Sequence, residues 1–154
     1  MEVGEIIHKY RMLKTSWGIV INIYGKVCEY DKFLCDEEFL MNKNVVRICE
    51  RIWVLFLPDK NENVGPDDSY NQMHPEDYPY LIEGLTKVSQ SIMQYTKYKN
   101  TLIIINRLEY SLCDFQKEGI IAGMMEWAAR AFGFECPKID VVYQKDINRY
   151  IYDF

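Results

Sequence analysis

The sequence lacks the motifs that mark the large enzyme and cofactor-binding families. It contains no GxGxxG, no Walker loop, no GxSxG and no HExxH. It also lacks a CxxC pair among its five cysteines, so neither a zinc knuckle nor a closed disulfide framework is predicted. We therefore expect no catalytic residues, no cofactor and no metal site.

Runs of basic residues and long apolar segments are missing as well. The chain has 23 acidic and 18 basic residues and a formal net charge of −5, with no Lys/Arg run to neutralise a phosphate backbone. It has no apolar run of about 18 residues and no basic-then-apolar N-terminus. We expect no nucleic-acid binding, no membrane span and no secretion signal. The odd set of cysteines favours the cytoplasm.

Strand patterns are present in several segments. A period of two, or a β-branched and aromatic run, indicates strands in the following places: residues 17–24, ending at Gly25, residues 45–57, ending at Pro58, residues 101–106, and a hairpin of residues 138–144 and 149–154. The run at 101–106 is apolar on both faces and predicts a central strand. Ile6, Tyr10 and Leu13 recur at helical spacing, but this segment is left open.

Two segments carry helical periodicity. Apolar residues at steps of three and four predict one helix from near Asp77 to Tyr95, with Pro79 in its first turn. A capping-box spacing at Ser111–Asp114 and the apolar residues that follow predict a second helix, which ends at Gly133. Gly119 and Gly123 on this helix indicate close packing against a sheet.

The element order predicts the fold class. We expect a single α+β domain over residues 1–154, built as a two-layer sandwich in which a mixed sheet of four to five strands carries two helices on one face. Residues 58–79, rich in Pro and acidic side chains, form an acidic loop. The other sheet face must be solvated, paired with the N-terminal segment or used for association, including a possible homodimer.

Three side-chain arrangements are candidates for chemistry. Cys113 at a helix start would gain nucleophilicity from the unpaired N–H groups, but no histidine stands at a recognisable spacing to it. Asp114 and Glu118 would share one helix face, an arrangement also expected of a solvated first turn. Glu126 and Arg130 are predicted to form an exposed i,i+4 ion pair.

The acidic loop is the predicted partner-binding surface, because it mixes carboxylates with rigid aromatic contact area. The proposed contact residues are Asp67, Asp68, Tyr70, Glu76, Asp77 and Tyr78. Such a surface suits a protein partner, in particular a basic toxin domain.

The C-terminal third resembles a known class of proteins. The segments that carry the resemblance are residues 114–119, the triplet Glu126-Trp127-Ala128, the pair Phe132-Gly133, and residues 148–154. They look like small bacterial immunity proteins of polymorphic-toxin systems, and the element order is similar to domain IV of elongation factor G. The resemblance implies a cytoplasmic protein that binds and blocks one cognate toxin without chemistry of its own.

These observations favour a protein-binding module, most concretely a toxin-neutralising immunity protein. Two other interpretations stay open. One is a small enzyme with Cys113 as nucleophile, and the other is a structural subunit that self-associates through an uncovered sheet face.

Overall fold

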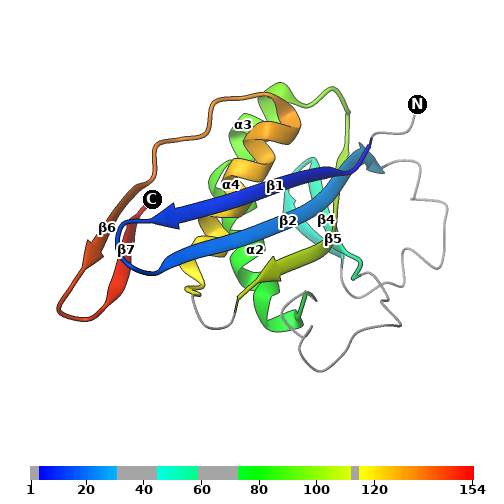
Figure 1. Ribbon diagram of the computed structural model, residues 1–154. Coiled ribbons are helices and arrows are strands. Elements are labelled where there is room, and N and C mark those ends of the chain that lie inside the picture. Colours follow the sequence, from blue (N-terminus) through cyan, green and yellow to red (C-terminus); the bar gives the residue numbers. More distant parts are fainter. Residues whose placement is uncertain (1–3, 31–44, 59–72, 112–114) are drawn as a thin grey trace.

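The computed structural model describes residues 4–30, 45–58, 73–111 and 115–154, and it has the predicted α+β architecture. A five-stranded mixed sheet carries the helices on one face, and a two-stranded hairpin lies beyond one end of the sheet (Figure 1). The strands of the main sheet follow the order β1-β2-β5-β4-β3, in which the β4–β5 pair is parallel and the other pairs are antiparallel.

The bounds of the elements are as follows. The main sheet contains β1 (Ile6–Leu13), β2 (Gly18–Glu29), β3 (Val45–Cys49), β4 (Ile52–Phe56) and β5 (Thr101–Tyr110). The helices are the 3-10 turn η3 (Pro75–Asp77), α2 (Tyr78–Lys87), α3 (Ser89–Tyr95) and α4 (Glu118–Phe132). The hairpin consists of β6 (Asp140–Gln144) and β7 (Arg149–Asp153).

The N-terminal segment whose conformation the sequence left open is the edge strand β1. Its burial alternates, with Tyr10 buried and Lys9 and Arg11 exposed. Ile6, Tyr10 and Leu13 are also spaced as on a helix, so the sequence pattern fits both conformations. The segment forms a strand because pairing with β2 satisfies its backbone N–H and C=O groups. The five strands of the sheet therefore include this segment and exclude the C-terminal hairpin.

The prediction of one long strand over residues 45–57 is wrong, because the chain turns back at Glu50 and Arg51. Two short antiparallel strands, β3 and β4, result. The Arg47 side chain fixes this turn by donating hydrogen bonds to the carbonyl oxygens of Cys49 (3.1 Å) and Glu50 (2.9 Å). The charged residues within the apolar run thus mark a turn.

Gly25 does not end its strand as predicted, since β2 continues to Glu29. The register with β5 shifts between Tyr24 and Gly25, which is a bulge. A Cβ at Gly25 would lie 2.8 Å from both the Ile104 carbonyl oxygen and the Trp127 ring. Glycine is required here because α4 and β5 approach the backbone closely.

The helix predicted up to Tyr95 is divided at Val88, whose φ of −113° and ψ of 13° are not helical. The Val88 N–H bonds to the Leu85 carbonyl (3.2 Å), so the chain tightens for one turn and α3 begins at Ser89. Leu81, Leu85 and Ile92 remain on one fully buried face across the division. Periodicity detects this face but not the change of turn.

Helix α4 lies directly on β1 and β2, as the two glycines indicated. A Cβ at Gly119 would approach Ile19 to 2.8 Å, and one at Gly123 would approach Ile23 to 3.3 Å. The helix ends at Gly133, whose φ of 80° is the left-handed value expected at this position. The core of the protein lies between this helix layer and the inner sheet face.

A buried amide helps to hold the β6–β7 hairpin against the rest of the chain. The Gln116 side chain accepts the Tyr150 N–H (2.7 Å) and donates to the Tyr150 carbonyl (2.9 Å). It thereby takes the place of a neighbouring strand at the free edge of β7. The Tyr150 ring packs edge-on against Trp17, 4.9 Å between centroids.

Substitution of Gly84 tests the packing of α2 on α4. A Cβ at this position would lie 2.7 Å from the Ile121 carbonyl oxygen and 2.8 Å from the Met124 Cβ, neither of which can move independently. We expect Gly84→Ala to lower the free energy of unfolding by about 1–3 kcal/mol through overpacking. Urea denaturation measures it. A gain of about 1 kcal/mol, as helix propensity alone predicts, would contradict this packing.

Candidate protein-binding surface

The C-terminal end of the predicted acidic loop is anchored in the core. Asp77 is 4% exposed and accepts hydrogen bonds from the Tyr110 hydroxyl (3.2 Å) and the His74 N–H (3.1 Å). Burial raises the pKa of this carboxyl, while the two hydrogen bonds oppose the rise. Asp77 therefore fixes η3 on the sheet and does not reach the surface.

Of the other predicted contact residues, two lie within the described residues. Tyr78 stacks on Phe56 with centroids 4.1 Å apart and is half-buried. Glu76 is exposed on η3. Asp67, Asp68 and Tyr70 lie outside the described residues. Within the described part of this loop, Glu76 is the carboxylate that faces solvent.

The helix carrying the predicted chemical candidates begins later than expected, at Glu118. Phe115 and Gln116 are not helical, and Asp114, the predicted neighbour of Glu118 on one helix face, lies outside the described residues. Cys113 lies outside the described residues, before this non-helical segment. Glu118 instead pairs with Arg149 of β7, at 3.3 Å.

Glu126 and Arg130 do not pair with each other, which corrects the third prediction. The Glu126 carboxylate bonds to Nε2 of His8 on β1 (2.8 Å), and the Arg130 guanidinium donates to the Ile7 carbonyl (3.2 Å). Both side chains tie α4 to the edge strand.

Burial, together with the charge of Glu126, raises the pKa of the nearby Cys136 thiol to about 11, so this thiol stays protonated at neutral pH.

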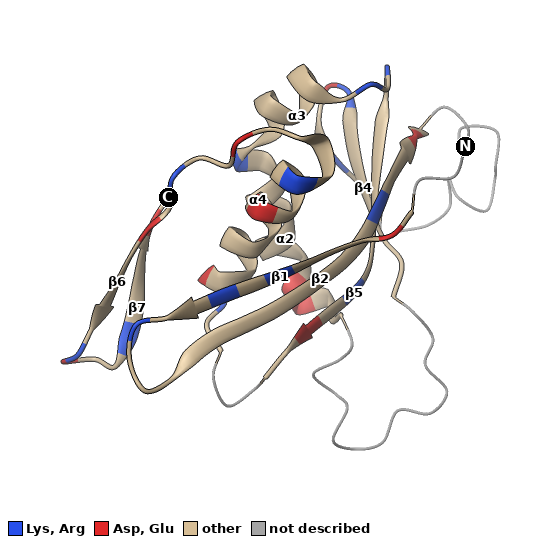
Figure 2. Ribbon diagram, turned by 45° about the horizontal axis from the view of Figure 1, so that its top comes forward, with Lys and Arg blue, Asp and Glu red and all other residues tan. Residues whose placement is uncertain are grey.

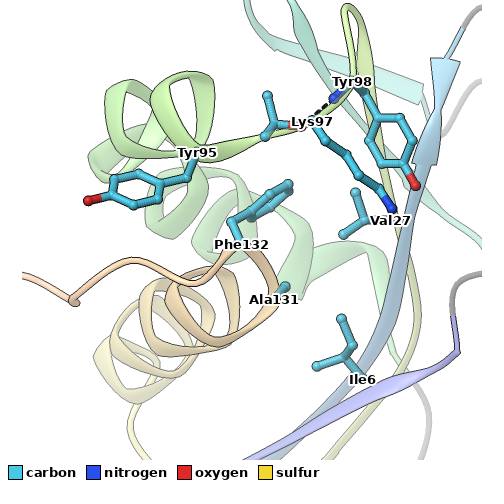
Figure 3. A pocket seen from close by; sticks show the side chains of 8 residues that line it. Ile6, Val27, Tyr95, Lys97, Tyr98, Ala131 and Phe132 are labelled. Carbon is cyan, nitrogen blue, oxygen red and sulfur yellow. Dashed lines mark hydrogen bonds between the residues drawn. The ribbon is translucent and has the colours of Figure 1, made fainter.

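A pocket of about 260 Å³ lies where α3 and α4 end (Figure 3). Ile6, Val27, Ala131 and Phe132 are among the apolar residues that line it, and Lys97 supplies an ammonium group. That group lies 5.3 Å from the Tyr98 ring centroid. The Thr96 hydroxyl is already bonded to Thr101 (2.8 Å). The pocket offers apolar contact and one cation, without an acid–base pair among its lining residues.

The sheet surface opposite the helices carries a second set of polar side chains. We call the part formed by β1, β2 and β5 the outer face. Its side chains are those of Glu5, Ile7, Lys9, Arg11, Leu13, Val20, Asn22, Tyr24, Lys26, Arg107 and Glu109. No helix of the described chain covers it, and Figure 2 shows basic positions along β1 and β2 and an acidic one on β5.

A hydrogen-bonded network fixes the middle of the outer face. The Glu109 carboxylate accepts from the Tyr24 hydroxyl (2.5 Å) and from Asn22 (3.2 Å), and it pairs with Arg107 at 2.9 Å. The Arg107 guanidinium lies over the Tyr24 ring, 5.4 Å from its centroid. The bond to Glu109 raises the pKa of Tyr24 and keeps its hydroxyl a donor. Arg11 extends the network to β1 through Asn22 (3.2 Å).

The same side of the sheet is apolar over β4 and the first half of β5. Leu55, Leu102 and Ile104 are buried there beside Tyr30. The Tyr30 ring stacks on the Trp53 ring with centroids 4.3 Å apart. The Arg47 guanidinium carbon lies 5.4 Å from the Trp53 ring centroid. The side opposite the helices is thus divided into a buried apolar half and the polar outer face.

The sequence predicted an uncovered sheet face but did not identify the side chains of the outer face, because it left the conformation of β1 open. The alternation of Lys9 and Arg11 with Tyr10 and Met12 was the available signal, but the helical spacing competed with it. Arg107 and Glu109 follow the apolar run of residues 101–106, and their period of two continues that strand to Tyr110. Pairing across strands, which no spacing reveals, joins them to Tyr24.

Comparison with known proteins assigns no relatives to this chain: no family model matches it, and neither does a curated protein or a solved structure. Among the described residues, no three His, Cys, Asp or Glu side chains are placed to hold a metal ion. None of the described helices has the length and apolar character needed to cross a membrane.

Removal of the Tyr110 hydroxyl tests the anchor at Asp77. In Tyr110→Phe the carboxylate stays buried with one partner fewer, so we expect the free energy of unfolding at pH 7 to fall by about 1–3 kcal/mol. The Asp77 pKa, followed by carboxyl NMR, should rise further. A carboxyl whose pKa is higher in the folded than in the unfolded state lowers the free energy of unfolding as pH rises from the unfolded-state pKa to the folded-state pKa. In Tyr110→Phe, this fall in the free energy of unfolding should therefore continue to a higher pH.

Tyr95→Phe is the matched control, because Tyr95 is 52% exposed. We expect this variant to unfold within about 0.5 kcal/mol of the parent protein. Equal effects of the two substitutions would contradict a specific role for the Tyr110 hydroxyl.

Proposed function

We propose that this protein is a protein-binding module and, more specifically, an immunity protein that neutralises a cognate bacterial toxin in the cytoplasm by direct binding. The observation that carries the proposal is the ordered network of Tyr24, Arg107 and Glu109 on an uncovered sheet face. Tyr and Arg are the residues that most often dominate binding energy at protein interfaces. Held in place before binding, they lose little entropy when a partner docks.

Exposed aliphatic residues beside the network support the same function. Leu13 and Val20 are 71% and 43% exposed and lie on adjacent strands near the β1–β2 turn. Polar residues fixed by cross-strand bonds next to accessible apolar groups are the usual composition of a non-obligate interface.

The resemblance of the C-terminal third to immunity proteins favours a toxin as the class of partner. Within that third, Gln116, Glu118 and Trp127 hold the hairpin, α4 and β1 together. We assign these residues a structural role, in which they keep the outer face in shape. The acidic loop remains a second proposed contact, through Asp67, Asp68, Tyr70 and Glu76.

The test is co-expression with the protein encoded by the adjacent gene. We expect the chain to restore growth of a host that this protein arrests, and to form a complex with a dissociation constant on the order of nanomolar. Isothermal titration calorimetry measures the affinity. Unrestored growth together with the absence of a nanomolar complex would rule out the immunity function for that pair.

Two variants separate the contributing residues. If the acidic loop contacts a basic partner, Asp67→Lys/Asp68→Lys/Glu76→Lys should weaken the complex by tenfold or more; unchanged affinity would exclude the loop. Asp77 is left intact because it is buried. Cys113→Ser should protect as well as the parent, whereas loss of protection with an intact fold would favour the enzyme interpretation.

A further inference from the structure

The outer face differs in charge from the rest of the chain. It carries the four cations Lys9, Arg11, Lys26 and Arg107 against the two carboxylates Glu5 and Glu109, while the whole chain has a formal net charge of −5. Glu109 is compensated by Arg107 within the network. Lys9 and Lys26 are exposed and have no hydrogen-bond or ion-pair partner within the described residues.

Protection of a sheet edge does not account for this charge. Basic side chains on an edge strand prevent strand-to-strand aggregation, which would explain Lys9 and Arg11 on β1. Lys26 and Arg107, however, lie on β2 and β5, which are not edge strands in the order of the sheet, and there they pair with Ile104 and Tyr24 respectively. Like charges gathered on one face repel one another and cost stability. Edge protection therefore accounts for Lys9 and Arg11 but not for the exposed Lys26, whose position on β2 points to a binding role.

The aromatic rings on this side of the sheet argue against nucleic acid as the ligand. Single-stranded nucleic acid binds sheets through exposed ring faces on which bases stack. The Arg107 guanidinium lies over the Tyr24 ring, and the Trp53 ring stacks on Tyr30 and has Arg47 over it. The exposed Val20 and Leu13 instead suit a protein surface.

We propose that the outer face docks an acidic surface of a protein partner, with Lys9, Arg11 and Lys26 pairing with its carboxylates and Val20 and Leu13 with its apolar groups. This inference rests on the proposed protein-binding function and specifies the chemistry of the partner. It is opposite in sign to the acidic loop, which suits a basic partner, so charge reversal distinguishes the two surfaces.

The direct experiment uses the full chain, labelled with ¹⁵N, and a peptide of ten glutamates as the probe. We expect the peptide to shift the amide resonances of β1 and of residues 20–26 at low salt, and the affinity to fall several-fold when salt is raised through the range in which exposed charges are screened. Lys9→Glu/Arg11→Glu should weaken binding at least tenfold, and Lys26→Glu should weaken it independently.

The matched control is Lys138→Glu/Lys145→Glu, which makes the same change in net charge at exposed positions outside the outer face. We expect it to alter affinity less than about threefold, because long-range charge effects are screened by salt. Thermal unfolding of each variant verifies the fold, and Lys26→Glu provides a second variant if Lys9→Glu/Arg11→Glu fails to fold.

Three outcomes would overturn the inference. The outer face would be excluded as the docking surface if the peptide left the resonances of β1 and β2 unshifted, or if the outer-face and control variants weakened peptide binding equally. Stronger perturbation of the same amides by poly(U) RNA than by the glutamate peptide would replace the protein partner with nucleic acid. A nanomolar complex with the adjacent gene product that is indifferent to Lys9→Glu/Arg11→Glu would leave the proposed function standing and refute the outer face alone.

Discussion

The close approach of α4 to β1 and β2 is the constraint on which the rest of the structure depends. Gly119 and Gly123 let the helix backbone lie on the sheet, where Cβ atoms would meet Ile19 and Ile23. That contact requires the buried side chains of β1 and β2, such as Tyr10 and Ile21, to point toward the helix. Because side chains alternate along a strand, it also directs Lys9, Arg11 and Lys26 outward. The same packing forms the core and presents the outer face.

The sequence alone was sufficient where the hydrophobic pattern acts locally. The fold class, the central strand at residues 101–106, the hairpin and the helix stop at Gly133 are confirmed. The turn at Glu50, the bulge at Gly25 and the division at Val88 were missed. The first is fixed by hydrogen bonds from the Arg47 side chain, the second by the close approach of α4 and β5, and the third by one tightened turn. The partners of Glu126 and Arg130 were missed because they lie more than 100 residues away in the sequence.

The candidate site shows where composition misleads. A chain of net charge −5 suggests a basic partner, yet the exposed charges of the outer face are mainly basic. Asp77, predicted as a contact residue, is buried in the core. Tyr24 and Arg107, which lie on the outer face, were not predicted from the sequence. Net charge constrains solubility and long-range steering, but binding depends on which charges share a face.

The most direct test of the central claim is lysine footprinting of the chain, free and bound to the adjacent gene product. Acetylation rates at single lysines report whether each ammonium group is accessible, without any substitution. The outer-face account predicts that Lys9 and Lys26 become protected in the complex while Lys138 and Lys145 react as before. Unchanged rates at Lys9 and Lys26 in the complex would contradict it.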